Sequence, residues 1–136
     1  MDSSKRWEIF LGAPNRRFSN GVRVTMNSRK VILLSKEAFE AIGSPAAVEL
    51  RWDENTRTIG LSPCDIAATN AFPLRQKVIN SSGKKHAYRL VHASPFCKHH
   101  GIGPDRTILF RDVDMDNDGT LLLELTTAIN IGRRIK

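Results

Sequence analysis

The sequence has few cysteines and no long hydrophobic run. Only Cys64 and Cys97 occur among its 136 residues, and so low a cysteine content favours reduced thiols over a disulfide framework. No apolar run approaches the roughly 18 residues that a membrane-spanning helix requires. The N-terminus also lacks the apolar segment of a signal peptide. We therefore expect a cytoplasmic protein with no membrane partner.

The chain also lacks a decisive catalytic motif. Cys97 is followed by Lys98, His99 and His100, but the ligands of a structural zinc site usually come in closely spaced pairs, and no second pair is present. A Cys–His nucleophilic pair would need a third orienting residue, which the sequence does not show. The simpler interpretation is a cysteine on a short helix with outward histidines. We predict a non-enzymatic protein without a cofactor.

Negative charge is the scarcer sign. The chain has 21 Lys and Arg residues against 14 Asp and Glu residues, a net charge of +7. Residues 1–36 contain eight basic and two acidic residues, and residues 69–111 contain eight basic and one acidic residue. A surplus of this kind suits an anionic partner such as nucleic acid.

The first half of the sequence predicts one strand–helix–hairpin unit. Residues 1–21 form a basic arm, and residues 22–63 form the unit. Within it, apolar residues alternate as in strands, Ser35 is placed to cap a short helix, and Gly43 is placed to end it.

The second half predicts the same order again. Residues 64–83 are rich in Pro, Asn and Ser and are expected to form a linker. Residues 84–127 then predict a strand, a short helix ended by Gly101 and a hairpin whose strands are residues 107–111 and 120–125 and whose turn lies at residues 116–119. Residues 128–136 form a tail. An internal duplication and a chance recurrence of this order both remain possible.

The apolar positions of the two units should form the core, because units of this size bury too little surface alone. The residues expected to be buried are Val31, Leu33, Phe39, Ile42, Val48, Leu50, Ile59, Leu61, Leu90, Phe96, Ile108, Phe110, Leu121 and Leu123.

Four segments of the first unit carry a family resemblance. Residues 28–33, 35–43, 48–50 and 58–63 resemble the AbrB-like swapped-hairpin domain of bacterial transition-state regulators and antitoxins. In that family a strand leads to a short helix ending in Leu-Gly or Ile-Gly, and a hairpin often ends in Leu-x-Pro. Lys30 stands where the family usually has glycine.

Two such units in one chain look like the MraZ arrangement, in which tandem units form a pseudo-dimer. The Asp-x-x-x-Arg signature associated with MraZ is missing here. The resemblance implies an α+β, mainly β fold whose two units pack as a pseudo-symmetric AbrB-like β-barrel. It also implies a DNA-binding transcriptional regulator.

Two basic pairs, Arg29-Lys30 and Lys84-Lys85, precede predicted strands at matching places in the two units. If the units are related by a twofold axis, both pairs could face one duplex, where Arg and Lys bind phosphates. A solvated basic surface without a ligand is the alternative interpretation. The predicted nucleic-acid face consists of Arg23, Arg29, Lys30, Lys84, Lys85 and Arg89.

The acidic turn admits a weaker metal hypothesis. Asp114, Asp116 and Asp118 match the opening of a calcium loop. Position 12 of that loop would be Leu125 rather than a carboxylate, and the segments on both sides are predicted to be strands where a calcium loop of this type has helices. A cation loop and a plain hairpin turn are the two interpretations, and the plain turn is favoured.

A protein-interaction module that binds no DNA is the alternative function. Such a module, antitoxin-like or a phage-type adaptor, would use its hairpin edges and the linker to bind a protein partner or a second copy of the chain.

Overall fold

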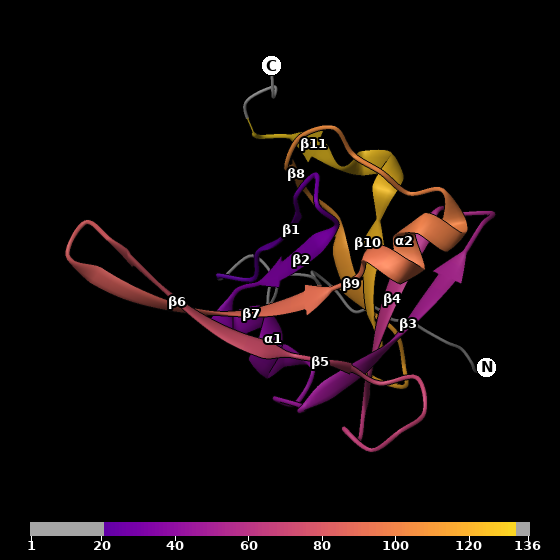
Figure 1. Ribbon diagram of the computed structural model, residues 1–136, viewed down its shortest axis with the longest axis horizontal. Helices are drawn as coiled ribbons and strands as arrows, with labels where there is room; N and C mark the ends of the chain where they lie inside the picture. The colour runs from indigo at the N-terminus through magenta and orange to yellow at the C-terminus, as the bar shows by residue number, and fades with distance from the viewer. Residues whose placement is uncertain (1–20, 133–136) are drawn as a thin grey trace, which may run out of the picture.

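The computed structural model describes residues 21–132, whose arrangement Figure 1 shows. Strands account for 44% and helices for 14% of the described residues, so the expected α+β, mainly β class is confirmed. Apart from Gly21, the predicted basic arm lies outside the described residues, as do the last four residues of the predicted tail. No helix within residues 21–132 is long and apolar enough to cross a membrane.

The strands form two antiparallel sheets and not the closed barrel that was expected. Sheet A contains, in spatial order, β11 (Ile129–Asn130), β8 (Ile108–Leu109), β1 (Val24–Met26), β2 (Val31–Leu34), β7 (Lys84–His92) and β6 (Arg75–Ser81). Sheet B contains β5 (Phe72–Pro73), β3 (Ala47–Asp53), β4 (Thr58–Cys64), β10 (Leu121–Glu124) and β9 (Val113–Met115).

A closed barrel would require an edge strand of sheet A to pair with an edge strand of sheet B. Within residues 21–132 no such ladder forms. The edge strand β6 instead follows β7 away from the body of the protein (Figure 1).

Two short helices follow equivalent strands. Helix α1 (Lys36–Ala41) follows β2, and α2 (Ser94–His100) follows β7. The predicted cap of α1 is confirmed, because the Ser35 Oγ accepts a hydrogen bond from the Ala38 N–H. The predicted helix end at Gly101 is also confirmed, with a φ of 70°. A 3₁₀ turn, η2 (Leu125–Thr127), follows β10.

Four adjacent strands in each sheet follow an order that is symmetric between the first and the second half of the chain. Sheet A contains the run β1-β2-β7-β6, and sheet B contains the run β3-β4-β10-β9. Exchanging β1 with β6, β2 with β7, β3 with β9 and β4 with β10 reproduces both runs, and it also exchanges α1 with α2. The connectivity of these strands is therefore twofold symmetric. Strands β5, β8 and β11 are additions outside this pattern.

The predicted linker at residues 64–83 needs correction, because it contains β5 and β6. The seven residues of β6 pair with β7 throughout. Only Val78 and Ile79 are apolar within β6, so its local sequence resembles a loop. The strand forms because β7 provides a complete ladder of backbone partners.

The predicted strand at residues 107–111 is shorter than expected and belongs to another sheet. Only Ile108 and Leu109 form β8, which pairs with β1 and β11 in sheet A. The hairpin that turns at residues 116–119 is confirmed, but its first strand is β9. Residues 110–112 therefore carry the chain from sheet A to sheet B.

The core lies between the two sheets. Eight of the expected core residues are buried: Ile42, Val48, Ile59, Leu61, Ile108, Phe110, Leu121 and Leu123. The other six are half-buried: Val31, Leu33, Phe39, Leu50, Leu90 and Phe96.

In β2 and β7 the prediction of which side chains face the core was wrong. Ile32, Leu34 and Val91 are buried instead of their neighbours. All four residues of β2 are apolar, so alternation could not identify the inner side. Pairing with β1 decides it, because Ile32 lies opposite Met26 in the ladder.

Candidate nucleic-acid interface

Charge is segregated between the two sheets. Residues 22–35 and 75–92, which build β1, β2, β6 and β7, contain eight Lys and Arg residues and no Asp or Glu. Residues 47–64 and 113–124, which build β3, β4, β9 and β10, contain seven acidic residues and two arginines. All six predicted site residues belong to the basic set.

Three exposed lysines of the basic set, Lys77, Lys84 and Lys85, lie on a two-stranded ribbon. Strand β2 pairs only with residues 89–92 of β7, whereas residues 84–88 pair, among the described strands, with β6 alone. We call residues 77–88 the ribbon. It extends from sheet A at the left of Figure 1 and turns at Ser82 and Gly83, whose φ values of 53° and 77° suit a tight two-residue turn.

The ribbon and its base carry cations on both faces. Residues paired across two strands lie on the same face, and successive residues alternate between faces. Lys77 lies opposite Tyr88 on one face, whereas Lys85 lies opposite Asn80 on the other. Lys77, Lys84 and Lys85 are all exposed. In this ladder no cation lies directly opposite another cation, so the charge is distributed without close repulsion.

Arg89 anchors the base of the ribbon. It is half-buried, and its guanidinium lies 4.3 Å from the centroid of the Phe39 ring in α1. At this distance a cation and an aromatic face attract each other. Arg89 therefore fixes β7 against α1 and is less available to a ligand than the three exposed lysines.

Arg29 and Lys30 lie at the other end of β2. The Asn27 Oδ1 accepts hydrogen bonds from the Arg29 and Val31 N–H groups at 2.9 and 3.1 Å. The Lys30 carbonyl accepts a hydrogen bond from the Ala93 N–H at 3.0 Å. These contacts place both basic residues beside the end of β7 that leads into α2.

The two basic pairs are therefore not brought together. Val31 lies opposite His92 in the ladder, and His92 is seven residues along β7 from Lys85. At about 3.3 Å per residue, this puts the pairs roughly 23 Å apart along the strand direction. Of the six predicted residues, Arg23 and Lys85 line a common groove.

Sequence reasoning missed three basic residues of this region. Arg75 and Lys77 fall in the predicted linker, and Lys36 was counted among the eight basic residues of 1–36 but was not included in the predicted face. The sequence does contain a signal for Arg75 and Lys77, because residues 66–104 contain no Asp or Glu and include all four histidines.

The acidic turn is closed by its own hydrogen bonds. Asp116 Oδ1 accepts hydrogen bonds from the Asp118 and Thr120 N–H groups, and Asp118 Oδ1 accepts one from the Thr120 hydroxyl at 2.7 Å. Hydrogen bonds with Asp116 and Thr120 lower the pKa of Asp118 to about 2. Within residues 21–132 no group of His, Cys, Asp and Glu is arranged to hold a metal ion. The structure therefore adds no support to the cation-loop hypothesis for Asp114, Asp116 and Asp118.

Cys97 has a structural environment. It is fully buried, its Sγ lies 3.8 Å from the Met26 Sδ, and burial raises the pKa of its thiol. His100 packs against Phe96 and Trp52, with ring centroids 4.8 and 5.6 Å away. These side chains hold α2 against the core.

Comparison with known proteins adds no relative: no family model, no curated protein and no solved structure matches the chain.

Proposed function

We propose that the protein is a non-enzymatic, DNA-binding transcriptional regulator of the AbrB/MraZ-like kind that acts in the cytoplasm. The observation that carries the proposal is the ribbon, which combines exposed lysines with a complete absence of carboxylates. Sheet A as a whole gives the ribbon a positive base, and sheet B keeps the acidic residues elsewhere.

The ribbon has the dimensions of a known type of DNA-reading element. Its five residue pairs span about 17 Å at about 3.4 Å per residue. The major groove of B-DNA is about 12 Å wide and admits a two-stranded β-ribbon. Lysines on both faces of an inserted ribbon would meet the phosphates of both walls. In this mode of binding, affinity comes mainly from phosphate contacts and depends strongly on salt.

Two observations support the family part of the proposal. The symmetric strand order is what two similar units packed about a twofold axis produce. Lys30, which stands at the usual glycine position of the family, has a φ of 66°. Glycine favours this left-handed region, so the backbone here keeps the conformation that a glycine would adopt.

Salt-dependent DNA binding tests the proposal. Fluorescence anisotropy with a labelled duplex, repeated over a range of salt concentrations, gives the slope of log affinity against log salt. For Lys77→Ala/Lys84→Ala, loss of two phosphate contacts should reduce this slope by about 2. The matched control Arg51→Ala/Arg57→Ala removes two cations from sheet B and should leave the slope unchanged. Equal slopes in both variants would refute the role of the ribbon.

A specific feature of sheet B favours the alternative, a protein-interaction module. A groove of about 370 Å³ lies on this sheet and is lined by apolar Gly60 and Leu122, by three carboxylates, Asp53, Asp116 and Glu124, and by one cation, Arg51. A groove with more carboxylates than cations and some apolar lining suits a basic segment of a partner protein. Under this alternative, Gly60→Arg would abolish partner binding while wild-type protein would show no salt-dependent DNA binding.

A further inference from the structure

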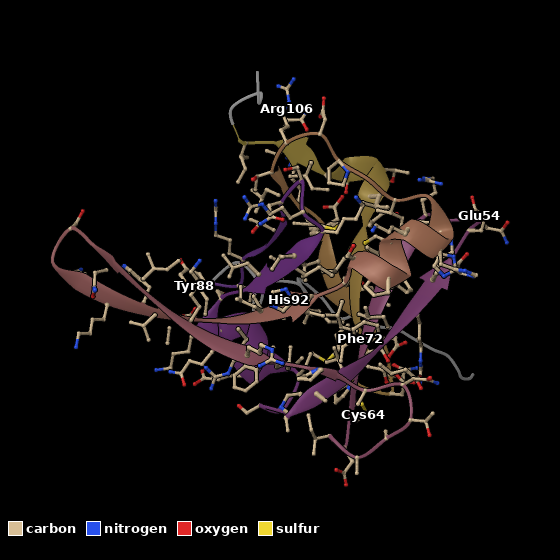
Figure 2. All side chains as sticks on the ribbon, viewed as in Figure 1. Glu54, Cys64, Phe72, Tyr88, His92 and Arg106 are labelled. Carbon is tan, nitrogen blue, oxygen red and sulfur yellow. The ribbon has the colours of Figure 1, made fainter. Side chains whose placement is uncertain are left out.

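A second groove lies where the ribbon leaves sheet A. It has a volume of about 340 Å³, and residues 85–88 of β7 form one of its walls. Figure 2 labels Tyr88, which lies at this junction. The opposite wall comes from the chain entering β1 and from the first residues of α1. The groove exists because β2 ends at Leu34, opposite Arg89, and α1 then replaces the neighbouring strand.

Ser35 holds the wall opposite β7 in place. Its Oγ accepts a hydrogen bond from the Arg23 N–H at 3.0 Å and donates one to the Gly21 carbonyl at 2.8 Å. The same Oγ caps α1 through Ala38. The backbone that carries Arg23 is therefore fixed relative to the helix that carries Lys36.

The groove is positively charged and its cations are accessible. Arg23, Lys36 and Lys85 line it together with one carboxylate, Glu37. All three cations are exposed, and none takes part in the four ion pairs found between described residues. Glu37 packs towards Gly21, since its Cδ lies 2.7 Å from where a Cβ on Gly21 would be.

Two aromatic rings complete the lining. His86 and Tyr88 both border the groove, and their ring centroids are 6.4 Å apart. By the alternation along β7, both rings lie on one face of the strand and Lys85 lies on the other, so the groove at this free strand edge is bordered from both faces. Flat rings and cations that border one groove are the combination that binds a base and its phosphate in single strands. The volume also falls in the range of about 300–1,000 Å³ typical of small-ligand sites.

We propose that this groove binds a nucleotide, with the phosphate at Arg23, Lys36 and Lys85 and the base against Tyr88 and His86. The nucleotide is either free or one unit of a nucleic-acid strand. The strand-borne form rests on the proposed function, because the ribbon would deliver the strand to the groove. The free form does not depend on it.

Titration of the full-length chain with adenosine monophosphate, followed by amide chemical shifts in NMR, tests this assignment. Shifts should concentrate at residues 35–37 and 85–88, and inorganic phosphate should bind more weakly to the same residues. For Arg23→Ala/Lys36→Ala, loss of two charge-assisted contacts should raise Kd at least about tenfold. The matched control Lys98→Ala/Arg111→Ala removes two cations from exposed positions outside the groove and should retain the wild-type Kd.

Two further measurements distinguish a free nucleotide from a strand-borne one, and the groove proposal from the ribbon proposal. A short single-stranded oligonucleotide that binds more tightly than the mononucleotide, with the same loss in the groove variant, would identify a strand-borne ligand. Mononucleotide binding that persists in Lys77→Ala/Lys84→Ala, or in a protein that fails to bind duplex DNA, would support the groove independently of the ribbon. Equal Kd values in the groove variant and its control, or shifts scattered over sheet A, would overturn the inference.

Discussion

Ser35 connects three segments through one hydroxyl group, and its replacement by alanine tests how the start of the fold is stabilised. The hydroxyl accepts hydrogen bonds from the Arg23 and Ala38 N–H groups at 3.0 and 3.2 Å, and it donates one to the Gly21 carbonyl at 2.8 Å. The residue is only 6% exposed. Ser35→Ala removes all three bonds and leaves three backbone groups without these partners, of which the Ala38 N–H is the buried one.

The expected loss can be summed from the three contacts. Loss of a serine cap destabilises a protein by about 1 kcal/mol. Each of the other two hydrogen bonds contributes about 1 kcal/mol. The free energy of unfolding should therefore fall by about 3 kcal/mol, a large share of the roughly 5–15 kcal/mol typical of a domain.

Urea denaturation followed by circular dichroism measures this loss as a lower midpoint at an unchanged slope. Ser28→Ala is a suitable control, because its hydroxyl makes no hydrogen bond to another described residue and its loss should cost less than about 0.5 kcal/mol. A loss for Ser35→Ala below about 1 kcal/mol, or equal to that of Ser28→Ala, would refute the reasoning. It would mean that water satisfies the backbone groups once the hydroxyl is gone.

Three further predictions concern the core, the acidic turn and the thiols. Ile32→Ala should destabilise the protein by about 3 kcal/mol and Val31→Ala by clearly less, because only Ile32 is fully buried; similar urea midpoints would contradict the assigned register. The pKa of Asp118 is lowered in the folded state to about 2 from 3.8, so its carboxylate stabilises the fold above about pH 4 and loses this effect as pH falls through 2. The melting temperature of Asp118→Asn should accordingly fall below that of wild type at pH 7 and converge with it near pH 2, and a gap that does not change with pH would contradict this. A thiol reagent should modify Cys97 only after unfolding, because burial protects it and raises its pKa, whereas partly accessible Cys64 should react in the native protein; prompt modification of both thiols would be inconsistent with the core.

Local chemistry accounts for what could be predicted along the chain. The serine cap at Ser35, the helix end at Gly101 and the turn at residues 116–119 depend on a few neighbouring residues. Such features are visible in the sequence because their hydrogen bonds close within one turn of the backbone.

Long-range pairing accounts for what could not be predicted. Strand β6 has a loop-like composition and forms because β7 lies beside it. The inner side of β2 depends on its register with β1, since its four residues are all apolar. The grouping of Arg23, Lys36 and Lys85 around one groove depends on where β2 ends relative to β7.

The sequence by itself determined the mainly β class, the order of strand, helix and hairpin in each half, and the surplus of positive charge. Only the tertiary structure decided that this charge gathers on sheet A and that the two basic pairs lie far apart. The reason is geometric, because β2 and β7 run antiparallel. Residues at or just before the start of these two strands must then lie at opposite ends of the pair, however similar the two sequences are.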